Sequence, residues 1–324
     1  MAAAAWRGCL FEGKDMAQPR YRFDFMGKRY LALGLSGVLL LLALGALIVR
    51  GLNLGLDFTG GTLVEIAYPT AVELDKVRTL LTQNGFENAA VQRFGTAREI
   101  LIRLPPDPEL SSAALSDKVL EVLRSEASAQ PELRRVEFVG PQVGEDLTER
   151  GGVAVLFSLI GILIYVAWRF EYRFALGAVL ALVHDCLITV GFFALTQREF
   201  DLSVLAAVLA IIGYSLNDTI VVFDRIRENF RRMRRGEALE IINTSISQTL
   251  SRTLLTSGTT LLVVFALAWL GGEIIRNFSL ALIVGIIVGT YSSVYVASAL
   301  LVFLKLKRED MLLPEKEAPG AERL

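Results

Sequence analysis

Long apolar runs separated by short polar connections dominate the sequence. A window of about 19 residues, the usual length for detecting spans, finds six such runs. They occupy residues 31–49, 151–168, 174–196, 202–223, 253–270 and 278–304. Each run has at least about 18 residues, which is enough to cross a bilayer. The pattern therefore predicts an α-helical polytopic membrane protein with six transmembrane helices.

The polar stretch between the first two runs, residues 51–150, has the short periods of a small α+β domain. The predicted elements are a strand at 61–68, a helix at 71–85, strands at 88–94 and 99–104, a helix at 113–129 and a strand at 134–140. The order β-α-β-β-α-β is typical of a ferredoxin-like unit. The glycines of "GLDFTGGT" (55–62) predict a tight turn that leads from the first span into the first strand.

Basic residues in the short connections predict the orientation in the membrane. Arg169 and Arg173 follow the second run, and six arginines follow the fourth: Arg225, Arg227, Arg231, Arg232, Arg234 and Arg235. The positive-inside rule puts these connections in the cytoplasm and the α+β domain outside. The predicted parts are a cytoplasmic N-terminal tail (1–30), an uncleaved first helix (31–50), the extracytoplasmic domain (51–150), helices two to six (151–304) with a basic cytoplasmic loop at 225–250, and a cytoplasmic C-terminal tail (305–324).

Composition agrees with a membrane protein and excludes several other classes. Apolar residues make up 53% of the chain and the mean hydropathy is +0.49. The net charge of −1 gives no electrostatic support for a nucleic-acid partner. The two cysteines, Cys9 and Cys186, lack metal-ligand or disulfide spacing. The sequence contains no phosphate loop, nucleophile elbow or HExxH motif, so it predicts no enzyme activity, no cofactor and no metal.

Two charged residues in apolar runs are candidates for function. Asp218 lies in the fourth run and Arg252 begins the fifth. A charge near the bilayer centre costs about 2.5–3.5 kcal/mol on insertion scales, so each needs a partner or a role. At similar depth they would form an ion pair that protonation of Asp218 releases. Asn217, Thr253, Thr256 and Ser257 add groups able to carry a proton or hold water. The alternative is a structural pair between helices.

Two further features of the runs leave alternatives open. His184 and Asp185 lie near the middle of the third run. They are either a polar contact that fixes this helix against its neighbours, the interpretation we favour, or a second titratable pair. Gly285 and Gly289 in the sixth run form a GxxxG pattern, which permits close helix packing either within the chain or with a partner.

Six motifs in order resemble the SecF members of the SecD/SecF protein-export family. They are "LNLGLDFTGGTLVEI" (52–66), "VEFVGPQVGEDL" (136–147), "HD" (184–185), "IGYSLNDTIVVFDRIRENFRR" (212–232), "SQTLSRTLLTSGTT" (247–260) and "YSSVYVASAL" (291–300). The resemblance covers about residues 20–310 and places the chain in the resistance-nodulation-division superfamily.

The resemblance implies a function and a set of partners. Members of this kind pair with a SecD subunit in a bacterial cytoplasmic membrane, bind the SecYEG channel and use the proton gradient to assist late translocation of an unfolded exported polypeptide. It implies that Asp218 is the embedded carboxylate and Arg252 the embedded arginine. Asp57, Gly60 and Gly61 match the signature at the base of the external domain.

Two other functions stand beside protein export. A proton-driven exporter of small molecules or lipids would use the same chemistry, although such exporters usually join two six-span halves in one chain. A membrane scaffold would need no intramembrane Asp and Arg. Copurification with a SecD-like partner favours export, substrate-dependent drug resistance favours the exporter, and indifference to neutralising Asp218 favours the scaffold.

Overall fold

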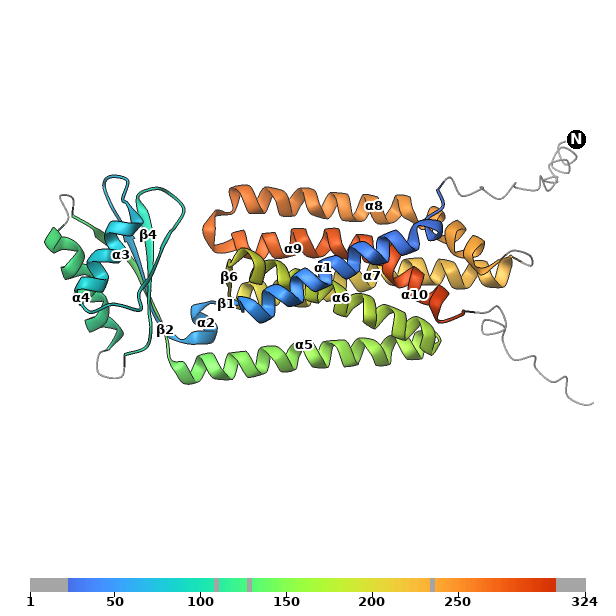
Figure 1. Ribbon diagram of the computed structural model, residues 1–324, viewed down its shortest axis with the longest axis horizontal. Coiled ribbons are helices and arrows are strands. Elements are labelled where there is room, and N and C mark those ends of the chain that lie inside the picture. Colours follow the sequence, from blue (N-terminus) through green and yellow to red (C-terminus); the bar gives the residue numbers. More distant parts are fainter. Residues whose placement is uncertain (1–22, 108–110, 127–129, 234–236, 307–324) are drawn as a thin grey trace, which may run out of the picture.

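The computed structural model describes residues 23–107, 111–126, 130–233 and 237–306, and it has two parts (Figure 1). A bundle of long helices forms one part, and a small α+β domain lies beyond one end of it. The start of α1 and the end of α10 lie at the opposite end of the bundle. The predicted cytoplasmic tails fall mostly outside the described residues, as do Cys9, Arg234 and Arg235.

Six helices are long and apolar enough to span a membrane, which confirms the predicted fold class. They are α1 (Arg29–Val49), α5 (Pro141–Arg169), α6 (Tyr172–Thr196), α7 (Leu202–Arg232), α8 (Ala238–Leu270) and α9 (Gly272–Ser292), the last continued by the π-helix η2 (Ser293–Ala297) and by α10 (Ser298–Phe303). A short 3₁₀-helix, η1 (Met26–Lys28), precedes α1.

The predicted basic loop at 225–250 is wrong, because α7 and α8 extend through most of it. Hydropathy detects only the part of a helix that lies in hydrocarbon. Beyond that part, arginine and glutamate are good helix formers, and here they pair along the helix. Arg225 and Arg232 both contact Glu228, at 2.9 and 3.5 Å. The end of α7 therefore projects as a charged extension past its apolar part.

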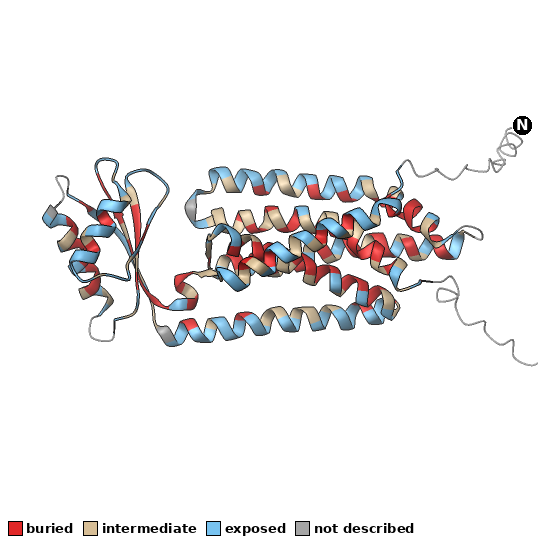
Figure 2. Cartoon of the chain, in the orientation of Figure 1, coloured by how far each residue is buried: buried red, intermediate tan, exposed pale blue. Residues whose placement is uncertain are grey.

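Burial separates inner helices from outer ones (Figure 2). Buried residues are concentrated in α6, α7 and α9, whereas α5 and α8 are largely exposed. The GxxxG pattern packs within the chain. A Cβ added at Gly285 would lie 2.3 Å from Ile211 Cδ1, and one at Gly289 would lie 3.0 Å from Ser215 Cβ. The two glycines thus let α9 approach α7 closely, which answers the question that the sequence left open.

The α+β domain beyond the end of the bundle is the predicted ferredoxin-like unit. Its elements are β2 (Gly61–Ala67), α3 (Leu74–Gln83), β3 (Ala90–Arg93), β4 (Glu99–Leu104), α4 (Ser112–Glu126) and β5 (Glu132–Val139). The four strands form one antiparallel sheet in the order β3-β4-β2-β5. Both helices cover one face and enclose a core that includes Val64, Leu81 and Val119. The domain ends before residue 150, since α5 already begins at Pro141.

A small joint connects the domain to the bundle, and the sequence did not predict it. Strand β1 (Asn53–Leu54) pairs in parallel with β6 (Glu199–Phe200), which joins α6 to α7. Arg103 of β4 forms an ion pair with Glu199, and its guanidinium also donates to the carbonyl of Leu54 at 2.9 Å. The sheet is therefore tied directly to the connection that begins α7.

Candidate functional site

The carboxylate of Asp218 is buried near the middle of α7. Only 3% of the residue is exposed. It lies about 24 Å from the first residue of the helix, Leu202, at 1.5 Å per residue. Asp218 and Arg252 are each about 21 Å from the connection that joins α7 to α8. Because these helices pack side by side, the two residues lie at similar depth.

Hydroxyl groups of α8 and α9 form a chain of hydrogen bonds that begins at Asp218. Ser257 of α8 donates to Asp218 Oδ2 over 3.3 Å, and Thr290 of α9 donates to Ser257 Oγ over 2.8 Å. Tyr214, one turn before Asp218, donates to the same serine over 3.4 Å. A hydroxyl both donates and accepts, so this chain of groups is chemically able to pass a proton from α7 to α9.

Arg252 lies near Asp218 without bonding to it. Within the described part of the chain, no ion pair joins the two residues. Arg252 is exposed and borders a cavity of about 220 Å³ that is also lined by Asp224 and Glu228. The expected ion pair is therefore absent from this conformation, and the arginine interacts with the carboxylate only at longer range.

The supporting polar residues divide into two groups. Ser257 contacts the carboxylate, and Thr253 is buried, with no hydrogen-bond partner for its hydroxyl among the described residues. Asn217 and Thr256 lie on exposed faces, and Thr256 bonds back to the carbonyl of Arg252 in its own helix. Sequence reasoning missed Tyr214 and Thr290. Tyr214 lies in the motif "GYSLND" and Thr290 in the motif "GTYSS". In each motif, several polar residues interrupt an apolar run.

His184 and Asp185 form a separate buried cluster. His184 Nδ1 lies 2.8 Å from Asp185 Oδ1. Asp185 Oδ2 accepts from Ser215 of α7 at 2.6 Å and from Ser292 of α9 at 2.7 Å. The cluster thus contacts α7 and α9, as expected of a polar contact that fixes α6 against its neighbours. Within the described residues, no group of three His, Cys, Asp or Glu side chains is arranged to hold a metal.

The signature turn holds the start of α7. Asp57 lies in α2 (Leu56–Thr59), and its carboxylate accepts from the backbone N–H of Leu202 at 2.8 Å. Asp201 caps the same helix by accepting from Val204 N at 2.8 Å. Two carboxylates at a helix N-terminus complement its unpaired N–H groups and its dipole. The signature therefore fixes the end of the helix that carries Asp218.

Both glycines of the signature have left-handed backbone angles, which confirms the predicted turn. Gly60 has φ 66° and Gly61 has φ 124°. A Cβ at Gly61 would lie 2.3 Å from the carbonyl oxygen of Leu104, which is a backbone atom of β4. Positive φ and close backbone approach are the two conditions that require glycine.

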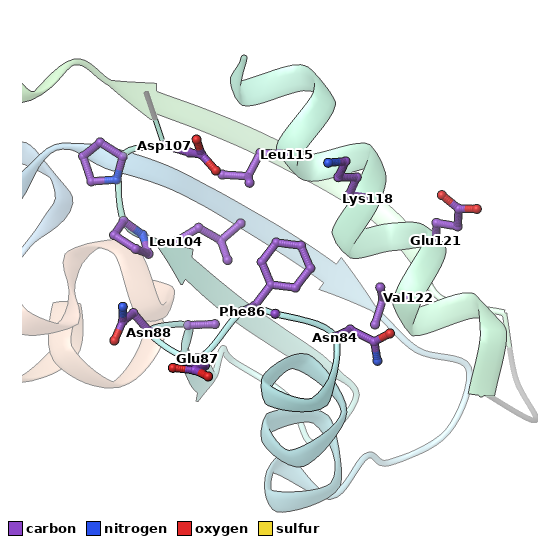
Figure 3. Close-up of a pocket in the computed structure, with 14 residues that line it drawn as sticks. Asn84, Phe86, Glu87, Asn88, Leu104, Asp107, Leu115, Lys118, Glu121 and Val122 are labelled. Carbon is purple, nitrogen blue, oxygen red and sulfur yellow. The ribbon is translucent and has the colours of Figure 1, made fainter. Parts of the chain in front are cut away.

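A groove of about 580 Å³ opens in the α+β domain, between α4 and the connection from α3 to β3 (Figure 3). Phe86, Leu115 and Val122 line it together with the charged residues Glu87, Lys118 and Glu121. The groove is on the helical side of the sheet, away from the bundle. It is thus distinct from the membrane-embedded carboxylates.

Two family models match the chain, and together they cover most of it. "Protein export membrane protein SecD/SecF, C-terminal" matches residues 118–307, and "SecD/SecF GG Motif" matches residues 45–71. The chain belongs to the SecD/SecF family. The second match contains the signature turn, and the first contains α5 to α10 with both buried carboxylates.

Individual relatives show that the chain is of the SecF type within this family. The chain is 55% identical over 273 residues to protein translocase subunit SecF of Vibrio alginolyticus, covering 84% of this chain and 87% of that protein. It is 50% identical over 294 residues to SecF of Pseudomonas aeruginosa, covering 90% and 94%. SecF proteins are transport subunits rather than enzymes.

A solved structure supports the same assignment. The crystal structure of SecDF from Thermus thermophilus, a translocon-associated membrane protein, matches with a TM-score of 0.80 and 43% identity. The match covers 88% of this chain but only 39% of the SecDF chain. The chain is therefore a multi-pass membrane protein of the SecF type, and it spans less than half of the solved SecDF chain.

Proposed function

We propose that this chain uses the proton gradient to promote late polypeptide export through the Sec channel, with Asp218 as the proton-coupling carboxylate. The observation that carries the proposal is the buried Asp218 with its hydroxyl chain through Ser257 and Thr290. Inserting a carboxylate into a bilayer costs free energy, so a carboxylate within a membrane span indicates a functional site. A scaffold would need neither the carboxylate nor the hydroxyl chain.

SecD is the proposed partner within the membrane. The solved relative is named SecDF and is much longer than this chain, and the outer faces of α5 and α8 are apolar and exposed here, as an additional bundle would require. The SecYEG channel, lipid and the exported chain are the further proposed partners. The relatives are protein translocase subunits, which favours polypeptide export over the export of small molecules.

Arg252 is proposed to respond to the charge on Asp218. It lies at the same depth, beside a cavity that also contains Asp224 and Glu228. When Asp218 is ionised, attraction favours the approach of Arg252; when Asp218 is neutral, the two acidic residues nearer the helix ends compete for it. The two protonation states would thereby favour different packings of α7 and α8.

The proposed function is tested by measuring export of a reporter protein with and without a proton uncoupler, in cells that have or lack this chain. Cells with the chain should show a large uncoupler-sensitive component of export. Cells without it should lose most of that component, because the coupling site is gone. An uncoupler-sensitive component of equal size in both strains would refute the proposal.

The proposed orientation puts the α+β domain outside the cytoplasm and both ends of the chain inside. Arg169, Arg173 and the arginines at the end of α7 lie at the opposite end of the bundle from the domain, as the positive-inside rule requires. A reporter enzyme that is active only outside should be active when fused after Gly85 and silent when fused after Arg232. The reverse pattern would invert this orientation.

A further inference from the structure

The His184–Asp185 cluster is more deeply buried and more tightly bonded than the Asp218 site. Asp185 has no exposed surface, and His184, Ser215 and Ser292 are exposed by 4%, 1% and 0%. Polar groups of α6, α7 and α9 converge on this carboxylate at 2.6–2.8 Å: the hydroxyls of Ser215 and Ser292 donate to Oδ2, and His184 Nδ1 lies beside Oδ1. Both oxygens of the carboxylate therefore have polar partners, as buried polar groups require.

Local structure on α9 is adapted to this contact. Ser292 is the last residue of α9, and the π-helix η2 begins at the next residue. Short π-helical segments often occur at functional sites. A Cβ at Gly289 would lie 3.6 Å from Asp185 Oδ2 and 3.0 Å from Ser215 Cβ. The absence of a side chain at Gly289 thus leaves room for the Asp185–Ser215 contact.

The pair has the chemistry of a proton site as well as of a polar contact between helices. His184 Nε2 is buried without a hydrogen-bond partner among the described residues, so one ring nitrogen is left to take or release a proton. The ionised carboxylate only accepts hydrogen bonds, whereas the protonated acid also donates one. A proton on Asp185 would therefore compete with the bonds from Ser215 and Ser292, which hold α7 and α9.

The same two helices carry the chain that leads to Asp218. Ser215 is three residues before Asp218 on α7, about 4.5 Å along the axis. Thr290, which bonds to Ser257, is two residues before Ser292 on α9. A shift of α7 against α9 at Asp185 would therefore also change the packing around Asp218. We propose that His184 and Asp185 form a second proton-binding site of the membrane domain, coupled to Asp218 through α7 and α9.

Other ionisable groups near the pair do not replace it. The elements that pack against α6 are α1, α5, α7, α9, α10 and η2. Apart from His184 and Asp185, the described titratable side chains in the apolar parts of these elements and of α6 are Tyr165, Cys186, Tyr214, Asp218, Tyr291 and Tyr295; Tyr30 and Tyr172 lie at the starts of α1 and α6. Tyr214 and Tyr291 are bonded elsewhere, to Ser257 and to the carbonyl of Ala32. The remaining charges of these elements lie toward the ends of the bundle: Arg29, Glu145, Asp146, Glu149, Arg150, Arg169, Arg173, Asp224, Arg225, Arg227, Glu228, Arg231, Arg232 and Arg276.

The inference rests on the proposed function and deepens it, so its test includes a readout that does not depend on export. The purified protein in lipid is titrated while its infrared difference spectrum is recorded, and the carboxylic acid band of Asp185 is identified by its loss in Asp185→Asn. Asparagine keeps an acceptor for Ser215 and Ser292 but cannot ionise. His184→Asn keeps an amide donor toward Asp185 and removes the titratable ring.

We expect each variant to lower gradient-dependent export by at least about tenfold, because moving one charge across 100 mV supplies more free energy than a tenfold change in an equilibrium needs. We also expect the native protein to show a titrating band that Asp185→Asn lacks. Ser279→Ala is a matched change at a buried serine of α9 whose hydroxyl has no hydrogen-bond partner in the described part of the chain, and it should leave both readouts unchanged. If Asp185→Asn does not accumulate in the membrane, the export measurement on His184→Asn alone tests the inference.

Two outcomes would overturn the inference. One is full gradient-dependent export by an asparagine variant at native abundance. The other is a spectrum in which no titrating band depends on Asp185. Asp218→Asn, measured in parallel, separates this failure from that of the proposed function. If Asp218→Asn abolishes coupling while both cluster variants retain it, only the second site is refuted.

Discussion

Replacing Asp218 with asparagine should abolish the gradient-dependent part of export and leave the protein folded. Asparagine has nearly the same shape and still accepts a hydrogen bond from Ser257, but it cannot take up a proton. Moving one charge across 100 mV supplies about 2.3 kcal/mol, and a tenfold change in an equilibrium needs only about 1.4 kcal/mol. We therefore expect at least a tenfold loss of the uncoupler-sensitive export rate, measured by pulse-labelling of a secreted precursor in cells.

The control for this substitution lies at the adjacent residue. Asn217 is exposed whereas Asp218 is buried, so Asn217→Ala should export normally. Equal membrane abundance and equal recovery of a SecD partner would show that Asp218→Asn has not simply unfolded the bundle. Normal export by Asp218→Asn at native abundance would mean that the carboxylate has a structural role.

Replacing Arg252 with methionine should cause a loss of similar size. Methionine preserves much of the side-chain length and removes the charge, so α8 keeps its packing while Asp218 loses its cationic neighbour. Arg252→Lys should retain part of the activity because it keeps the charge. Leu255→Met, a change on the same exposed face of α8, is the matched control and should have little effect.

The double substitution tests whether the two residues act as one element. Residues in one coupled network show non-additive effects, so Asp218→Asn with Arg252→Met should be hardly worse than either single change. Both single variants and the double variant are compared in the same precursor-processing assay. Losses that multiply would mean that Asp218 and Arg252 act independently, in conflict with the coupling proposed here.

The parts of the fold that depend on local periodicity could be predicted from the sequence. Apolar residues alternate with polar ones in β2 and recur at helical spacing in α3, because one side of each element faces the same core, which contains Val64 and Leu81. The spans follow from bilayer thickness. Helix ends outside the bilayer could not be predicted, because Arg225, Glu228 and Arg232 are stabilised by contacts along the helix rather than by hydrophobicity.

The candidate site could be predicted only in part, for a related reason. An acidic residue in an apolar run is conspicuous, so Asp218 was found. Its partners Ser257 and Thr290 lie on other helices, and only helix packing decides which of many hydroxyl groups face it. The same limit applies to Arg252: it lies at a depth similar to that of Asp218, but the expected ion pair is not among the interactions of the described residues. The pairing of Arg103 with Glu199 likewise depends on how the domain meets the bundle.

The most direct test of proton coupling through Asp218 is export into membrane vesicles under an imposed proton gradient. Vesicles contain the native chain or Asp218→Asn at equal abundance, ATP is held constant, and the translocated amount of a reporter polypeptide is measured with and without uncoupler. Native vesicles should export more with the gradient than without it. Vesicles with Asp218→Asn should export the same amount in both conditions, equal to the uncoupled native level. A response of Asp218→Asn vesicles to the gradient as large as the native response would contradict the account.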